Sequence, residues 1–322
     1  MTQEIVPEKQ SVSACLKNKK YYIDFYQREY VWSRETVEIL LNDIMYSFNL
    51  SYEEHKNEDL CEELINKFNW YYLNVFITNQ IDGKIFIVDG QQRLSTLTLI
   101  ALYLYHKNKN ELLKRDLEQC IFSVDKYSGE IFNLDNEKRK KAMECVFKQK
   151  SEFMEYKYIN RTEQTIIERY NDIKKYFEQQ SFGDKKIEFF TAYFLDRLVL
   201  VELSINKDDT PMVFEVINDR GEALKPFEIL KGKLLGALPK SETEKYDDIW
   251  QNAMGLLSDM EDKFFTDFIK SKFVFKRNSE LEKSINNEYH RYLFSNNDIA
   301  KTLGFQKQNL KQIQNIKNFS CF

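Results

Sequence analysis

Proline, glycine and cysteine are scarce in this chain of 322 residues, which has 4 Pro, 9 Gly and 5 Cys. The few Pro and Gly form no linker or low-complexity tract, so the sequence shows no segment of the kind that usually separates independent domains. The cysteines are odd in number, far apart and never in a CxxC spacing, which argues against a disulfide framework and a zinc site. These features are typical of a protein from a reducing, cytoplasmic setting.

A strong charge of one sign and long hydrophobic runs are also missing. The chain has 47 Lys and Arg against 51 Asp and Glu, so a contact with DNA requires a local basic patch. No apolar run reaches about 18 residues, the length of a membrane span, so we expect neither a membrane anchor nor secretion. GxxxxGK[ST], GxGxxG and HExxH do not occur, and the histidines have no metal-ligand spacing. The best-known nucleotide and zinc signatures are therefore absent.

Aromatic residues, in contrast, are abundant at 15% of the chain, which predicts an aromatic core. Hydrophobic periodicity predicts an α+β fold, with a mixed first third and a mainly helical remainder. We place a soft boundary near residue 105, between an α+β domain of residues 1–105 and a helical region of residues 106–322, although the two can form one integrated domain. The clearest predicted elements are a helix capped by Ser33, a hairpin around Asp82 and Gly83, a second hairpin over 120–134, a helix over 162–180 and a strand over 197–205.

The most informative segment is IFIVDGQQRLSTLTLIALYL, residues 85–104, where a polar cluster separates an apolar strand from an apolar helix. A strand that turns directly into a helix exposes unpaired N–H groups, which bind anions. Gly90 permits the tight turn, and Asp89 can cap the helix or hold a hydrated cation. The other polar residues available to a phosphate are Gln91, Gln92 and Arg93, with Ser95 and Thr96 about a turn further on. The simpler alternative is an Asp-Gly turn followed by a solvated first turn.

A second polar cluster, DFYQREYVW at residues 24–32, places Gln27 and Arg28 among aromatic residues. Arg28 can pair with a phosphate. The aromatic residues that can stack on a nucleic-acid base are Tyr26, Tyr30 and Trp32. The alternative is a sheet-edge strand with core aromatics and a salt-bridged arginine.

A third cluster lies in residues 210–235, where two predicted helices flank the turn Asn218-Asp219-Arg220-Gly221. This turn suits the left-handed C-terminal end of a helix, and the second helix is expected to start near Pro226. The turn offers a carboxylate, an amide and a guanidinium at one point, with Lys231 in reach. A helical hairpin with exposed charges is the structural alternative.

Together, YQREYVW, IVDGQQRLSTL and FEVINDRGEALKPFEILKGKLL resemble the N-terminal domain family of GmrSD-type, modification-dependent restriction enzymes. The three motifs occur in the family's order and span residues 21–235. Two positions depart from its pattern: Asp24 replaces a proline, and Lys225 replaces a Ser or Thr that favours a helix start. The resemblance implies a ParB/sulfiredoxin-like fold with an added helical region.

The resemblance also implies that a nucleoside triphosphate, GTP or ATP, is bound and hydrolysed with Mg²⁺, coupled to recognition of foreign, often modified, DNA. The implied catalytic residues are Asp89, Gln91, Gln92 and Arg93, with Asp89 as the metal ligand. The implied nucleotide-binding residues are Gln27, Arg28, Gly90, Ser95, Thr96, Asn218, Arg220, Gly221 and Lys231. In this hypothesis Arg93 and Arg28 neutralise phosphate charge, and Gln91 or Gln92 orients the attacking water.

Two functions of other classes stay open. A DNA-binding module without chemistry would place the same arginines on backbone phosphates and Tyr26, Tyr30 and Trp32 on a base, with strong salt dependence. A ParB-like nuclease would cut DNA through Asp89 and a metal. Because the chain contains no His-Asn-His motif, we expect any other DNA cleavage to come from a C-terminal nuclease domain or a separate nuclease subunit. A homodimer is a further expected assembly.

Overall fold

The structure is a computed structural model, and it describes residues 7–23, 29–125, 129–148, 161–180, 182–206, 225–236, 238, 240–257, 260–273, 285–286 and 289. The chain divides into two compact units, residues 1–24 with 29–214 and residues 25–28 with 215–322. The boundary predicted near residue 105 falls within helix α4 (Gln91–Lys107) of the first unit.

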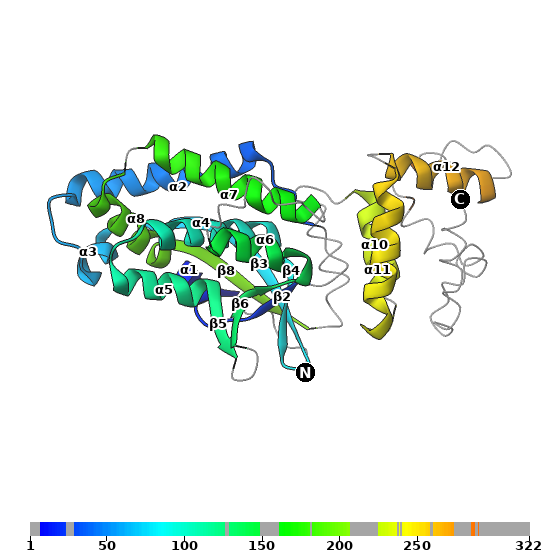
Figure 1. The fold of residues 1–322 in the computed structure, drawn as a ribbon, viewed down its shortest axis with the longest axis horizontal. Helices are drawn as coiled ribbons and strands as arrows, with labels where there is room; N and C mark the ends of the chain where they lie inside the picture. The colour runs from blue at the N-terminus through cyan, green and yellow to red at the C-terminus, as the bar shows by residue number, and fades with distance from the viewer. Residues whose placement is uncertain are drawn as a thin grey trace. The chain divides into compact units, whose positions relative to one another are not determined.

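A mixed sheet of six strands forms the base of the first unit among the described residues, in the order β1-β8-β3-β4-β2-β7 (Figure 1). Its strands are β1 (Pro7–Ser11), β2 (Tyr21–Ile23), β3 (Tyr71–Ile81), β4 (Lys84–Asp89), β7 (Leu134–Asp135) and β8 (Leu198–Ile205). β3 and β4 are antiparallel and form the predicted hairpin. Its turn residues Asp82 and Gly83 have positive φ angles of 51° and 75°, as two-residue hairpin turns of this kind require.

The second predicted hairpin is also present. It consists of β5 (Phe122–Asp125) and β6 (Gly129–Phe132), which pair antiparallel to each other outside the main sheet. Its first strand starts later than expected because Cys120 and Ile121 end helix α5 (Glu111–Ile121). The predicted strand over 197–205 is confirmed as β8.

Helices cover the sheet of the first unit, and α4 runs through their middle (Figure 1). The others are α1 (Val12–Leu16), α2 (Arg34–His55), α3 (Glu62–Lys67), α5, α6 (Glu137–Lys148), α7 (Arg161–Gln179) and α8 (Asp184–Asp196). α4 contacts α5, α7 and α8, and every residue from Leu94 to Leu104 is buried. As predicted, Ser33 caps α2, because its Oγ accepts a hydrogen bond from Thr36 N at 3.2 Å.

The core of the first unit is strongly aromatic, as the composition predicted. Phe48 of α2 packs edge-on against Phe190 of α8 at a centroid distance of 5.1 Å, and Tyr103 of α4 stacks on Phe177 of α7 at 4.7 Å. Such pairs add to the free energy gained by burying their large apolar area. They join α2 to α8 and the later part of α4 to α7.

The second unit is helical in its described residues. Its helices are α10 (Pro226–Gly236), α11 (Lys240–Gly255) and α12 (Glu261–Phe273), with α10 starting at the predicted Pro226. Its small core consists of Leu230, Leu234, Phe265, Ile269, Ile285 and Tyr289. The chain is therefore an α+β protein with a mainly helical later region, as predicted.

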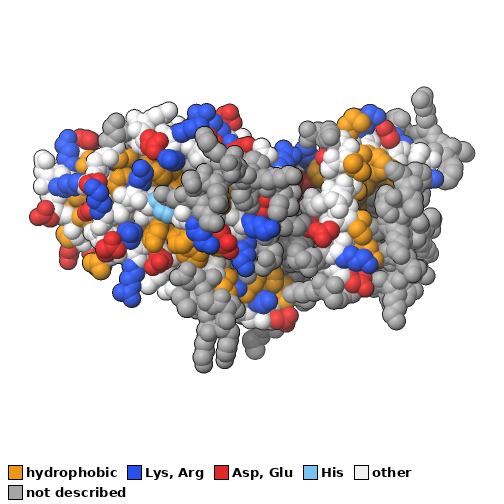
Figure 2. Space-filling view, viewed as in Figure 1, with side chains coloured by type: hydrophobic (Ala, Val, Ile, Leu, Met, Phe, Trp, Pro, Cys, Tyr) orange, Lys and Arg blue, Asp and Glu red, His pale blue; other side chains and the backbone are white. Residues whose placement is uncertain are grey.

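On the part of the surface that Figure 2 shows for the described residues, charges of both signs are mixed. Lys and Arg side chains are interspersed with Asp and Glu on the face of the first unit seen in Figure 2. Within the part of the chain that the structure describes, no helix is long and apolar enough to cross a membrane.

Candidate functional site

The strand-to-helix turn predicted at Gly90 is present and depends on that glycine. β4 ends at Asp89, Gly90 has a φ of 91°, and α4 begins at Gln91. A Cβ on Gly90 would lie 2.7 Å from Phe76 Cβ of the neighbouring β3, closer than side chains allow. A glycine is therefore required at position 90 both by the left-handed backbone and by the close approach of the two strands.

The first turn of α4 contains no acidic residue. The N-cap of this helix is a glycine, and no side chain caps it. Helix N-termini carry a partial positive charge and N–H donors, so an uncapped start favours an anion. Asp89 precedes it as a half-buried carboxylate at the end of β4.

Arg93 lies beside this helix start. Its guanidinium makes one long hydrogen bond, from Nη1 to the carbonyl oxygen of Val75 at 3.3 Å. Burial lowers the pKa of Arg93, and the nearby charge of Asp89 raises it by less. No carboxylate of the described residues forms an ion pair with Arg93, although a guanidinium has five N–H donors. The side chain therefore keeps capacity for a further acceptor.

Gln92 has a different role from the predicted one. Its Nε2 donates to the carbonyl oxygen of Glu29 at 2.7 Å, and its Oε1 accepts from Val31 N at 2.9 Å. The carboxamide thus pairs with the backbone on both sides of Tyr30. These contacts do not suit a residue that orients water, and instead fix the segment after residue 28 against α4.

Tyr30 is fully buried, with 0% exposure. Its hydroxyl forms a hydrogen bond with Thr96 Oγ1 at 2.9 Å, and burial raises the pKa of Tyr30 to about 12. The expectation that Tyr30 stacks on a base does not fit this position, because both ring faces lie in the core. Thr96 is also fully buried, so its contact with a phosphate is not supported either.

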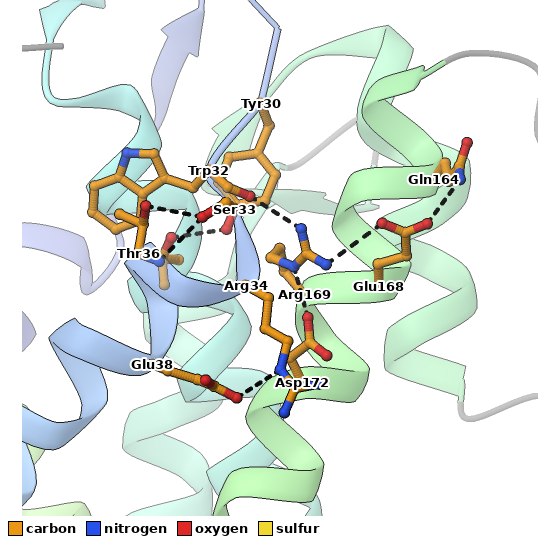
Figure 3. Close-up of polar contacts among 11 residues, drawn as sticks. Tyr30, Trp32, Ser33, Arg34, Thr36, Glu38, Gln164, Glu168, Arg169 and Asp172 are labelled. Carbon is orange, nitrogen blue, oxygen red and sulfur yellow. Dashed lines mark hydrogen bonds and ion pairs between the residues drawn. The ribbon is translucent and has the colours of Figure 1, made fainter.

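The residues after Tyr30 are held to α7 by Arg169 (Figure 3). Arg169 donates from Nη1 to the carbonyl oxygen of Trp32 at 3.2 Å and from Nε to Asp172 Oδ2 at 2.8 Å. The half-buried Trp32 packs against the core. Arg169 is thus a compensated cation that anchors one side of the site.

Arg139 of α6 is the residue of this region that the sequence did not predict. It is 4% exposed, and it donates from Nη2 to Gln91 Oε1 at 2.9 Å and from Nη1 to Ser95 Oγ at 2.6 Å. Ser95 in turn donates to the carbonyl oxygen of Gln91 at 2.6 Å. Both acceptors of Arg139 are neutral, and no described carboxylate forms an ion pair with it. In the sequence it lies in EKRKK, a charge run of the kind that usually covers a solvated helix face.

Lys231, predicted as a nucleotide ligand, lies in the second unit and has its own counter-ion. Its Nζ lies 2.7 Å from Asp247 Oδ1 of α11, and both side chains are buried. Lys225 stands where the family usually has a Ser or Thr that would cap α10. The Glu228 side chain makes up for the missing cap, because its Oε2 accepts a hydrogen bond from Lys225 N at 2.8 Å. Gln27, Arg28, Tyr26, Asn218, Arg220 and Gly221 lie outside the described residues.

The structure therefore brings together Asp89, Gly90, Gln91, Gln92, Arg93, Ser95 and Thr96 around the start of α4, and adds Arg139. No group of three or more His, Cys, Asp or Glu able to hold a metal occurs among the described residues. Four cysteines, Cys15, Cys61, Cys120 and Cys145, are free thiols.

These features define an α+β protein with a polar, anion-suited turn between the central strands and the central helix. The sequence also matches the family model described as GmrSD restriction endonuclease, N-terminal domain, over residues 12–235. The chain belongs to this family and is thus a module of a restriction system. No curated protein matches the chain.

Proposed function

We propose that the first unit binds and hydrolyses a nucleoside triphosphate, GTP or ATP, and couples hydrolysis to recognition of DNA, often modified, in a restriction system. The observation that carries this proposal is Arg93, a mostly buried guanidinium that, among the described residues, makes one hydrogen bond of 3.3 Å beside the uncapped start of α4. Phosphoryl transfer requires positioned donors and positive charge more than covalent chemistry. The start of α4 combines both.

The phosphates would lie against the N–H groups at the start of α4, with Arg93 neutralising their charge. The steric contact of Gly90 with Phe76 keeps a side chain out of the turn, so the backbone stays open to close approach. The buried Gln92 and Thr96 contribute by fixing the neighbouring backbone and Tyr30, respectively.

Asp89 is the residue that would hold Mg²⁺ with the nucleotide. It lies half-buried at the end of β4, directly before the helix start. Mg²⁺ keeps several waters and is commonly held by one or two carboxylates together with phosphate oxygens. A single carboxylate at this position fits that arrangement, in which the metal neutralises phosphate charge.

Gln27 and Arg28 are assigned to the same site from the family resemblance; the described residues that flank 24–28 contact the strand and the helix that meet at the turn. Ile23 pairs with Ile87 in parallel strands, whose ends point to the same edge of the sheet. Glu29 accepts a hydrogen bond from Gln92. Asn218, Arg220 and Gly221 are assigned from the family resemblance alone.

DNA is the proposed target of the coupled system, through Tyr26 and Trp32 among other residues. Cleavage would come from a C-terminal nuclease domain or a separate nuclease subunit. The family model matched by the chain is that of an N-terminal domain, which favours this division of labour.

The test is binding and turnover of GTP and of ATP with Mg²⁺ by the full chain, compared with Arg93→Ala. We expect Arg93→Ala to weaken nucleotide binding by about 10-fold to 100-fold, the loss typical of one charge-assisted hydrogen bond. Arg115→Ala is the matched control, because Arg115 is an exposed arginine on α5. Calorimetry measures binding, and phosphate release measures turnover, each with and without DNA.

Each remaining outcome selects another function. If the wild type binds neither nucleotide but binds DNA with a steep salt dependence, a DNA-binding module replaces the proposal. If it nicks DNA with a metal and Asp89→Ala abolishes nicking, the unit is itself a nuclease.

A further inference from the structure

Arg139 is a buried cation whose described contacts are all neutral. Its two hydrogen-bond acceptors are the carboxamide oxygen of Gln91 and the hydroxyl of Ser95. Burial lowers the pKa of Arg139 to about 10, while electrostatic interactions with Tyr30 and Glu29 raise it by less. The side chain is therefore still charged at neutral pH. Burying an unpaired charge is costly, so its retention needs a reason.

Two other cations, the half-buried Arg169 and the buried Lys231, have that cost offset within the protein. Arg169 pairs with Asp172 at 2.8 Å, and Lys231 pairs with Asp247 at 2.7 Å. Arg139 lacks such a partner among the described residues, although it lies within hydrogen-bond distance of the first residue of α4. Its charge is thus directed at the helix start where the phosphates are proposed to bind.

The hydrogen bonds of Arg139 also fix the orientation of Gln91. A guanidinium only donates, so the atom of Gln91 that faces it must be the oxygen, and the amide nitrogen faces away. Ser95 accepts from Arg139 and donates to the carbonyl oxygen of Gln91, which gives the network one consistent arrangement of protons. Gln91 is thereby held with its donor side turned away from α6.

We propose that Arg139 is a positioning residue of the nucleotide site, which supplies a positive charge behind the start of α4 that no carboxylate of the described residues pairs with, and which holds Gln91 in a donor orientation. This inference rests on the proposed nucleotide-binding function. The charge acts on the phosphates through Gln91 and Ser95, without direct contact. Because the intervening region is buried, its attraction is weakly screened by solvent.

The decisive variant is Gln91→Glu, which places a carboxylate against Arg139. It neutralises the cation within the protein and removes the amide donor, so we expect nucleotide affinity to fall by about 10-fold or more. At the same time the new ion pair should keep the thermal midpoint of unfolding at or above that of the wild type. Gln180→Glu is the control, since it adds the same charge at an exposed position.

Two substitutions of Arg139 complete the test, with Mg²⁺-GTP and Mg²⁺-ATP as probes in calorimetry. Arg139→Met should weaken binding about as much as Gln91→Glu, whereas Arg139→Lys, which keeps the charge, should retain more affinity than Arg139→Met. A purely structural role for Arg139 predicts that a folded Gln91→Glu binds within about twofold of the wild type, and this result would overturn the inference. A Gln91→Glu protein less stable than the wild type also contradicts it, because the carboxylate would then have met no uncompensated cation.

Failure of the proposed function looks different. In that case the wild type binds neither nucleotide, and the inference falls with it. If the wild type binds nucleotide and the variants bind equally well, only the role of Arg139 is lost.

Discussion

Helices α4 and α10 begin in opposite electrostatic environments, although both follow motifs that predicted phosphate contacts. α10 starts with two carboxylates in place: Glu228 accepts from Lys225 N at 2.8 Å, and Asp262 accepts from Phe227 N at 2.9 Å. α4 starts at a glycine, with no acidic residue in its first turn. Carboxylates at a helix start satisfy its N–H donors and its partial charge. The start of α10 is thus satisfied within the protein, and that of α4 favours an external anion.

The buried cations of the two regions repeat this difference. Lys231 of α10 is paired with Asp247, whereas Arg139 beside α4 contacts neutral acceptors. A buried cation with its own counter-ion contributes to the packing of α10 on α11. A buried cation that no described carboxylate pairs with can instead attract an anionic ligand. The comparison therefore assigns Lys231 to the packing of the second unit and supports the proposed nucleotide site at the start of α4.

The largest effect is expected from breaking the compensated pair. Asp247→Asn leaves the Lys231 ammonium buried without a counter-charge, and removing one partner of such a pair costs about 3 to 5 kcal/mol. Hydrogen exchange in α10–α12 measures the change. Asp248→Asn, an exposed neighbour, should have little effect. Equal exchange rates in the two variants would show that Lys231 needs no partner, and the contrast with Arg139 would be lost.

The next effect tests how the start of α4 is kept open. Gly90 and Gly83 both have positive φ, but a Cβ on Gly90 would lie 2.7 Å from Phe76 Cβ, whereas one on Gly83 would meet nothing within 4 Å. Gly83→Ala should cost about 1 kcal/mol of unfolding free energy from backbone strain. Gly90→Ala should cost about 2 to 4 kcal/mol, because overpacking is added. Urea unfolding of both variants measures the difference, and equal losses would mean that the contact with Phe76 is easily relieved.

Local signals predicted much of the fold and the position of the turn. The Asp82-Gly83 turn, the Ser33 cap and the apolar spacing of α7 each depend on residues close in sequence, and all three were confirmed. The change from an apolar strand to an apolar helix likewise located the turn at Gly90.

The contacts between distant segments escaped prediction. Arg139 contacts Gln91 and Ser95, which lie more than 40 positions away in the sequence. Because its sequence neighbours are charged, it was expected to face solvent. Tyr30 was predicted to stack on a base because its sequence context is basic and aromatic. The fold instead buries its ring in the core, where its hydroxyl forms a hydrogen bond with Thr96. The pairing of Lys231 with Asp247 was also not predicted, because the two residues lie on different helices.

The smallest effect concerns the cap of α10, and it tests whether that helix start needs its carboxylates. Glu228→Gln keeps an acceptor for Lys225 N but removes the charge, so we expect a loss of about 0.3 to 1 kcal/mol, the usual size of a charge–helix-dipole interaction. The loss should shrink with added salt, because this contact is exposed. Unfolding of the full chain at low and high ionic strength, monitored by exchange in α10, measures it. A loss independent of salt would mean that Glu228 acts through packing, and the electrostatic contrast between α10 and α4 would then depend on Asp262 and the buried pair alone.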